Sequence, residues 1–206
     1  MNILVSCPEI DNITRYLRVW TKRLIKKHNQ RNKIIPLEKD QATRKRFCGT
    51  IEKLHPDLVL VNGHGNYDIV CGHNGEVLLD LENVNLLSGM KIHAMSCRSA
   101  KILGKKAVDA GARCYVGYVE NWTLMMRSGM LSNPLQDSTA ELFMRPAFKV
   151  QEALINGKSA SVAVQVGIRE YKRSIVKAYR GPIQSDWEQC IPYLIASMKF
   201  LKAWGQ

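Results

Sequence analysis

Residues 58–66 of the chain, LVLVNGHGN, contain the pattern that decides the fold. The first four are apolar without a break, and a polar, glycine-rich turn follows them at once. A short, uninterrupted apolar run is typical of a strand buried on both faces, as in a parallel sheet covered by helices. Further short strands are predicted at residues 2–6, 33–37, 91–95 and 113–118.

Segments with helical spacing lie between the predicted strands. The first is amphipathic, because its apolar residues recur every three or four positions from Ile13 to Leu24. Residues 41–54 and 99–110 predict two more helices, the second closed by Gly111. Strands that alternate with helices indicate an α/β fold, with a mostly parallel sheet and helices on both faces in three layers.

The C-terminal third is mostly helical by the same criterion. We expect an interruption at Pro146, a stop at Asn156-Gly157 and a final helix from Trp187 to Leu201. Residues 162–168 are ambiguous, because their aliphatic side chains alternate as in a strand. Residues 120–133 show no clear period and are interpreted as a mobile loop.

The composition places the chain among globular proteins. A length of 206 residues predicts a single domain over residues 1–206. The fractions of apolar and charged residues, 46% and 23%, exclude the disordered and collagen-like classes. No apolar stretch reaches the roughly 20 residues that span a bilayer, so neither a membrane anchor nor a secretory signal is expected. Six scattered cysteines without a CxxC pair are typical of reduced thiols, which predicts a cytoplasmic protein.

The net charge of +12 is unevenly distributed. Residues 1–60 contain 13 basic and 6 acidic residues, a balance of +7, and the rest of the chain contributes +5. This pattern favours a solvated basic face, and leaves a nucleic acid or an acidic protein as alternative partners. Aromatic residues do not interleave with the basic run 44–46, so a stacking platform for bases is not indicated and nucleic acid is not the favoured partner.

Two residues capable of catalysis follow predicted strands. His64 lies in the turn after the strand that begins at Leu58, and Cys97 follows the strand 91–95. In an open parallel sheet the ligand crevice lies beyond the carboxyl ends of the strands. If the two strands are neighbours, both side chains face one crevice, and Gly63 and Gly65 allow a substrate backbone to approach the imidazole.

The chemistry that this pair favours is acyl transfer from a peptide. A helix beginning near Ser99 would place Cys97 at its positive N-terminus and, together with an imidazole, would lower the pKa of the thiol from about 8.5. The thiolate is the nucleophile, and the first backbone N–H groups of that helix, with that of Gly65, are candidate donors to an oxyanion.

Two simpler interpretations compete with catalysis. A cysteine after a buried strand is often an inert core residue, and a histidine between glycines can merely fill a turn. The other alternative is a zinc site, although the spacing of the five available ligands matches no common zinc pattern, and we expect no metal or other cofactor. These ligands are His64, Cys71, His73, His93 and Cys97.

Three stretches together resemble the caspase-like cysteine peptidases. They are residues 59–66 (VLVNGHGN), 92–100 (IHAMSCRSA) and 109–118 (DAGARCYVGY). Within that group the sequence is most similar to CHAT domains, with separases and gingipains as more distant relatives. The resemblance implies the caspase-like fold, which is a mostly parallel sheet between helices, and it implies that residues 162–168 belong to a helix.

The resemblance also implies an activity and its residues. His64 would be the general base and acid, Cys97 the nucleophile, and the backbone amides of Gly65 and Cys97 the oxyanion hole of a cysteine endopeptidase that forms a thioester acyl-enzyme. No acidic third member is required in this family. The caspase signature Q-A-C-[RQG]-G is replaced by residues 95–99 (MSCRS), and the histidine and cysteine are 33 positions apart instead of about 50, so a preference for aspartate does not carry over.

Specificity and activation are left open by the sequence. Asp68 could meet a basic substrate side chain and Arg98 or Arg127 an acidic one, while Asn66 is a further candidate for the substrate pocket. We expect a protein or peptide substrate, and activation by a protein partner, homodimerisation or processing. The alternative functions are a catalytically silent caspase-fold scaffold that binds a protein, and a basic nucleic-acid-binding α/β domain.

Overall fold

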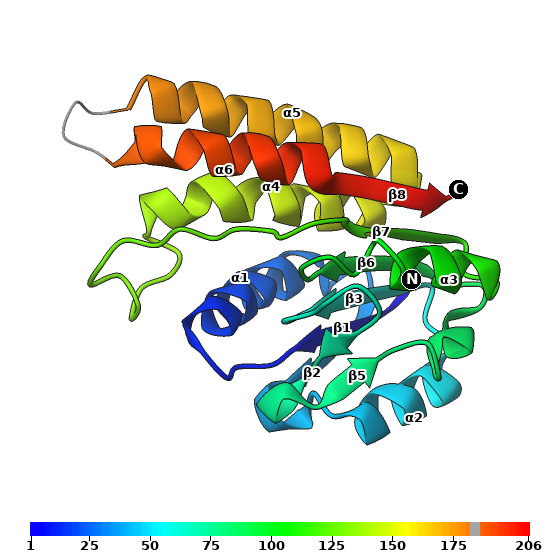
Figure 1. The fold of residues 1–206 in the computed structure, drawn as a ribbon. Helices are drawn as coiled ribbons and strands as arrows, with labels where there is room; N and C mark the ends of the chain where they lie inside the picture. Colours follow the sequence, from blue (N-terminus) through cyan, green and yellow to red (C-terminus); the bar gives the residue numbers. More distant parts are fainter. Residues whose placement is uncertain (182–185) are drawn as a thin grey trace.

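The computed structural model describes residues 1–181 and 186–206, which are built around a six-stranded sheet (Figure 1). The strand order is β2-β1-β3-β6-β7-β8. The first five strands are parallel, and β8 pairs antiparallel with β7 at one edge. The bounds are β1 (Asn2–Cys7), β2 (Lys33–Glu38), β3 (Leu58–Asn62), β6 (Lys91–Met95), β7 (Cys114–Tyr118) and β8 (Leu201–Gly205).

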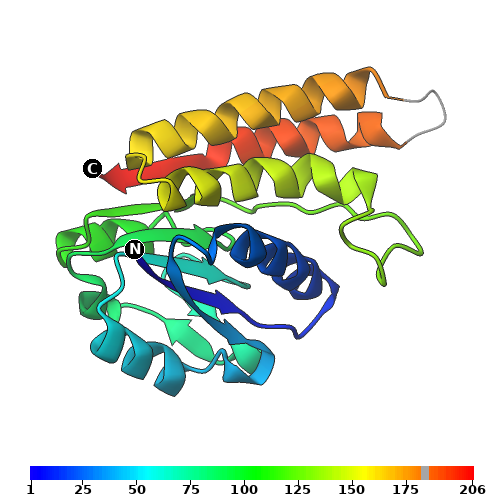
Figure 2. The same cartoon turned by 180° about the vertical axis from the view of Figure 1, so that it is seen from behind.

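Helices cover both faces of this sheet, as Figures 1 and 2 show. One face packs against the four longest helices, α1 (Asn12–His28), α4 (Ser138–Ile155), α5 (Ala160–Tyr179) and α6 (Trp187–Phe200). The other face is covered by α2 (Arg44–Leu54), α3 (Leu103–Asp109), the short turns η1 (Lys39–Gln41), η2 (His73–Gly75) and η3 (Val84–Leu87), and a hairpin of β4 (Val70–Cys71) and β5 (Val77–Leu79). The predicted α/β class, with a mostly parallel sheet between helices, is confirmed.

The uninterrupted apolar character of β3 follows from this arrangement. Leu58 and Leu60 belong to the core beneath α1 and α4, whereas Val59 and Val61 belong to the core on the opposite face. All four side chains are fully buried, which is why the strand contains no polar residue before Asn62.

The ambiguous segment 162–168 lies inside helix α5, in agreement with the helix that the resemblance implies. Its valines carry no helical signal because the buried stripe of α5 is made of small residues. Val162 is exposed, while Ala160, Ala163 and Gly167 are buried three to four positions apart. At Gly167 a Cβ atom would lie 2.6 Å from Val150 Cγ2, so glycine allows α5 to approach α4 closely.

Two predictions about local structure are wrong. Pro146 does not interrupt a helix, because α4 continues through it from Ser138 to Ile155, and its ring is buried in the core. The predicted final helix is confirmed over Trp187–Phe200, and residues 201–205, for which no strand was predicted, form β8. The helix after Cys97 begins at Leu103 and not near Ser99, since a turn occupies the intervening residues.

The segment between β7 and α4 forms no helix or strand over residues 119–137, which agrees with the predicted loop. It starts at the carboxyl end of β7 and runs beside the first turns of α1 and α4 (Figure 1). Within the described part of the chain, no helix has the length and apolar character needed to cross a membrane.

Candidate active site

The carboxyl ends of β3 and β6 lie side by side in the sheet. The two strands are parallel neighbours, and their last paired residues are Asn62 and Met95. His64 and Cys97 each follow two residues later, so they leave the sheet at the same level. The expectation that the two strands are neighbours is confirmed.

Both residues continue toward the face of the sheet that carries α1 and α4. The Asn62 side chain donates to Thr21 Oγ1 of α1 at 3.0 Å and accepts from Gln151 Nε2 of α4 at 2.8 Å. Met95 lies in the same core, and Cys97 packs against that core. His64 bonds to Asp11, the residue that caps α1, so both His64 and Cys97 lie toward this face.

The backbones of the two turns are in contact at Gly65. A Cβ atom at this position would lie 2.1 Å from Ser96 Oγ, 2.8 Å from Ile69 O and 3.2 Å from the carbonyl oxygen of Cys97. At Gly63 a Cβ atom would lie 2.5 Å from Cys71 O. Close packing therefore requires glycine at both positions, and it is Gly65 that allows the histidine turn to approach the cysteine turn, whereas Gly63 lies against the Cys71 backbone.

The His64 imidazole is partly open to solvent and binds a carboxylate. Its Nε2 lies 2.6 Å from Asp11 Oδ2, and the exposed fractions of the two side chains are 42% and 43%. The turn itself is fixed by a 2.8 Å hydrogen bond from Cys71 N–H to His64 O and a 3.0 Å bond from Asn66 N–H to Ile69 O.

Asp11 is the N-cap residue of α1, four residues past the end of β1. Its Oδ1 accepts from the Thr14 backbone N–H at 2.8 Å, and the Thr14 hydroxyl in turn accepts from the Asp11 N–H at 3.0 Å. Partial burial acts to raise the pKa of the Asp11 carboxyl, but the hydrogen bonds from Thr14 and His64 outweigh it and hold this pKa below its usual value. Asp11 is thus an ionised partner for the imidazole.

Cys97 is in a different environment from His64. The side chain is half-buried, and its Sγ donates to the Trp122 carbonyl oxygen at 3.5 Å. Burial raises the pKa of the Cys97 thiol above its usual value, and the charge of Arg98 only partly offsets this effect. The expected lowering of this pKa by a helix N-terminus is wrong, because the helix starts six residues later, at Leu103.

The carbonyl group that holds the thiol belongs to a well-anchored residue. Trp122 is buried, and its Nε1–H donates to Tyr171 Oη of α5 at 3.1 Å. The Tyr171 hydroxyl also lies 2.9 Å from the Tyr118 hydroxyl at the end of β7. These bonds tie the segment beside Cys97 to the outer helices.

The backbone amides expected to form the oxyanion hole remain available. Within the described residues, neither Gly65 N–H nor Cys97 N–H donates a hydrogen bond to another group of the protein. Both belong to the two turns that are in contact at Gly65.

Arg98, a candidate for binding an acidic side chain, directly follows Cys97 and has a strained backbone conformation. Its φ of 60° lies in the left-handed region, which is uncommon for a residue with a side chain, and such residues cluster at functional sites. The guanidinium lies 5.2 Å from the centre of the Tyr67 ring and 3.9 Å from the Glu120 carboxylate. Arg98 is therefore already engaged within the protein.

The remaining specificity candidates lie on exposed positions. Asn66 and Asp68 are exposed on the turn after His64, and Arg127 is exposed on the segment that leads to α4. The Arg127 backbone N–H donates to the buried Asp137 carboxylate at 2.9 Å, which fixes its place in the chain. Of the four candidates, Arg98 alone is adjacent to Cys97 in the sequence.

The five side chains considered as zinc ligands do not gather. Across residues 1–181 and 186–206, no group of three or more His, Cys, Asp or Glu side chains is placed to hold a metal ion. His93 is fully buried in the sheet, with Nδ1 3.2 Å from Gln151 Nε2, and burial lowers its pKa to about 3. It is a neutral core residue beneath the site.

The sequence patterns point to the histidine and the cysteine but miss Asp11. A signal for it is present, since the motif Asp11-x-x-Thr14 before an amphipathic run is typical of a helix N-terminus. The same residue follows a third parallel strand, β1, which lies next to β3. An acidic N-cap that follows a strand next to the histidine-bearing strand is therefore the signal by which Asp11 could have been found.

No model of a known protein family matches the chain. A search among curated proteins likewise finds no match. The function of the site therefore has to be inferred from its own residues and geometry.

Proposed function

We propose that the protein is a cysteine endopeptidase of the caspase-like type, most similar to CHAT domains, in which His64 and Cys97 form the catalytic pair. The observation that carries this proposal is the register of β3 and β6. It brings one imidazole and one thiol out of the sheet at the same level, on turns that touch at Gly65.

The reaction would proceed through a covalent acyl-enzyme. His64 takes the proton of the Cys97 thiol, and the sulfur attacks the carbonyl carbon of the substrate peptide bond. The oxygen of the tetrahedral intermediate, which carries the negative charge, accepts hydrogen bonds from the backbone N–H groups of Gly65 and Cys97. His64 then gives the proton to the leaving amine, and water hydrolyses the thioester with His64 again as the base.

In the present structure the pair is in a resting arrangement. The imidazole Nε2 bonds to Asp11 and the thiol bonds to Trp122 O, and within the described residues no hydrogen bond joins the imidazole to the thiol. Catalysis requires the thiol to leave this carbonyl group and turn toward the imidazole. We therefore expect activation by substrate, a protein partner, dimerisation or processing to act on the segment around Trp122.

Cleavage of a diverse peptide library, analysed by mass spectrometry, tests the proposal. The wild-type protein is expected to cut peptides, and Cys97→Ala is expected to abolish the cleavage. Cys71→Ala is the matched control, because Cys71 is also half-buried, burial also raises its thiol pKa, and it lies beside the same turn. Equal cleavage by Cys97→Ala and the wild type would refute peptidase activity at this site.

The resting hydrogen bonds also favour one alternative, a silent scaffold that binds a protein partner. Under this alternative the pair stays apart with and without a partner. A peptidyl acyloxymethyl ketone, which alkylates an activated cysteine, would then modify Cys97 no faster than it modifies Cys71. Selective modification of Cys97 would exclude the scaffold.

A further inference from the structure

The carboxylate on His64 comes from a third strand end. β1, β3 and β6 are neighbours in the sheet, and the segments that follow them provide Asp11, His64 and Cys97 in that order. Asp11 Oδ2 lies 2.6 Å from the imidazole Nε2, which is the distance of a charge-assisted hydrogen bond.

We propose that Asp11 is a positioning residue that completes a Cys97–His64–Asp11 triad. It holds His64 in the tautomer with hydrogen on Nε2 and leaves the lone pair of Nδ1 for the thiol of Cys97. This inference rests on the proposed peptidase function and extends it, since the family that the sequence resembles requires no acidic member.

The assignment of the two nitrogens follows from hydrogen-bond chemistry. An ionised carboxylate can only accept, so the nitrogen that faces it must carry the hydrogen. A neutral imidazole carries one hydrogen, and the bond made by one nitrogen decides the role of the other. Nδ1 of His64 is therefore the base, and when it takes the Cys97 proton the positive charge of the ring lies beside Asp11.

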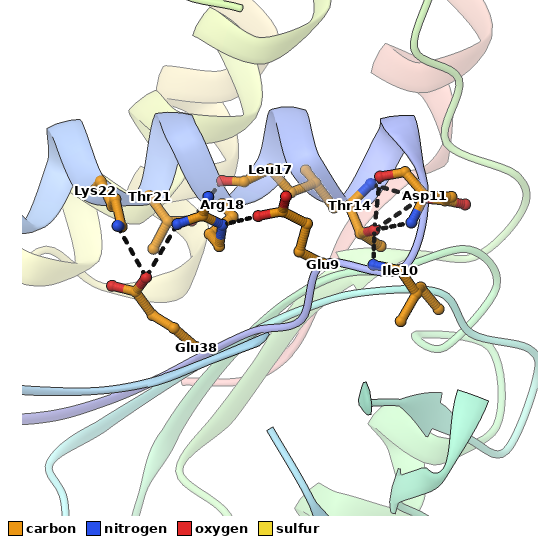
Figure 3. Close-up of polar contacts among 9 residues, drawn as sticks. All are labelled: Glu9, Ile10, Asp11, Thr14, Leu17, Arg18, Thr21, Lys22 and Glu38. Carbon is orange, nitrogen blue, oxygen red and sulfur yellow. Dashed lines mark hydrogen bonds and ion pairs between the residues drawn. The ribbon is translucent and has the colours of Figure 1, made fainter. Parts of the chain in front are cut away.

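Asp11 is well suited to this role because its two oxygens have separate tasks. Oδ1 accepts from the Thr14 backbone N–H and caps α1, while Oδ2 remains for His64 (Figure 3 shows the capping contacts). The positive end of a 17-residue helix further favours the ionised carboxylate. The helix thus fixes both the position and the charge of the group.

The loop that carries Asp11 is held from its other side by an ion-pair cluster, which Figure 3 also shows. Arg18 of α1 bonds to Glu9, two residues before Asp11, and to Glu38 of β2 at 3.2 Å. Lys22 binds the same Glu38 oxygen at 3.1 Å. The side chain of Arg18 is only 12% exposed, so this contact is protected from solvent and anchors the loop to the helix and the sheet.

Asp11→Asn separates positioning from helix capping. Asparagine is as good an N-cap as aspartate, so the melting temperature should change little. It removes the negative charge beside the imidazole, and the amide can offer N–H in place of an acceptor, which favours the wrong tautomer. Replacing a buried triad aspartate in this way lowers the rate about 10⁴-fold. Because Asp11 is half exposed, we expect a smaller fall, of at least roughly tenfold, in the alkylation rate of Cys97 by a peptidyl acyloxymethyl ketone, whose peptide part occupies the substrate site.

The matched control is Ser159→Ala, which removes the N-cap of α5 on another part of the fold. It should lower the melting temperature by about 2–4 °C and leave the Cys97 alkylation rate within about twofold of the wild type. The pH profile gives a second readout. The ratio of the wild-type rate to the Asp11→Asn rate should be largest where the Asp11 carboxyl is ionised and should fall toward one as acid protonates that carboxyl, whereas a purely structural effect would keep the ratio constant.

The results separate failure of the triad from failure of the peptidase pair. If His64→Ala slows Cys97 alkylation and Asp11→Asn does not, the triad is refuted and the peptidase pair stands. The triad is also refuted if Asp11→Asn slows alkylation only in proportion to lost stability, as judged against Ser159→Ala. If His64→Ala has no effect, both the pair and the triad are refuted.

Discussion

The two halves of the site differ in how far they are prepared for catalysis. On the β3 side, His64 is partly solvent-exposed and already bonded to an ionised carboxylate. On the β6 side, Cys97 is half-buried, its pKa is raised by burial, and its thiol is held by Trp122 O. If the protein is the proposed peptidase, the base is in place and the nucleophile is not, and we expect any regulation of this site to act on Cys97.

Removal of the His64 imidazole should have the largest effect on the reactivity of Cys97. His64→Ala should lower the rate of Cys97 alkylation by roughly 10² to 10⁴-fold near neutral pH, because no base remains to take the thiol proton. The rate at each cysteine is measured by peptide mapping after brief exposure to a peptidyl acyloxymethyl ketone, whose peptide part occupies the substrate site. His73→Ala, which removes a half-buried imidazole from η2, is the control and should leave the rate unchanged. Equal rates in His64→Ala and the wild type would mean that His64 does not act as a base for the Cys97 thiol.

Acid should weaken the core that lies beneath both halves. The fold holds the pKa of His93 at about 3 by burial, against 6.5 for an ordinary histidine, so protons bind the unfolded chain preferentially. The stability that His93 contributes is complete above pH 6.5 and falls as the pH drops toward 3, by up to about 1.4 kcal/mol per pH unit. Urea unfolding at several pH values should show that the free energy of unfolding falls less steeply with decreasing pH in His93→Gln than in the wild type. Identical slopes in the two proteins would contradict the buried, neutral state of His93.

Separating the two turns should affect both halves together. In Gly65→Ala the new methyl group would collide with Ser96 Oγ and Ile69 O, so the turns must move apart. Since a displacement of about 1 Å costs up to 10²-fold in rate, we expect Cys97 alkylation to slow by about tenfold or more. Gly49→Ala in α2 is the control, because a Cβ atom there meets no other atom within 4 Å. An active, stable Gly65→Ala would show that the turns are not in close contact.

The smallest expected effect concerns the cysteine half alone. Tyr171→Phe removes the hydroxyl that binds Trp122 Nε1 and Tyr118, and so loosens the segment that holds the thiol. We expect the alkylation of Cys97 to become a few-fold faster, at a stability cost of about 1 kcal/mol per lost hydrogen bond. Tyr179→Phe, at an exposed position of the same helix, should change neither. A slower reaction in Tyr171→Phe would mean that Trp122 supports the site and does not restrain it.

The parts of the fold that were predictable share a local cause. β1, β3 and β6 are buried on both faces, so each contains a short, mostly apolar run, and polar residues that are at least partly exposed follow in the turns after β3 and β6. This pattern led directly to His64 and Cys97. Helix α1 was predictable for the same kind of reason, since one apolar stripe faces the sheet.

The parts that were not predictable depend on contacts distant in sequence. Strand β8 forms because residues 201–205 pair with β7, and its own sequence carries no alternating pattern. The state of Cys97 depends on Trp122 and on burial, neither of which is visible near residue 97. Asp11 has a local signal for a helix cap, but its bond to His64 joins positions 53 residues apart.

The decisive quantity for the catalytic pair is the distance between His64 Nδ1 and Cys97 Sγ after reaction with a peptidyl acyloxymethyl ketone. In a crystal structure of the adduct, we expect a bond from the inhibitor to Cys97, Nδ1 within about 4 Å of the sulfur and Nε2 still on Asp11. The pair would be refuted by an imidazole more than about 6 Å from the sulfur and turned to another edge of the molecule, or by an adduct on a different cysteine.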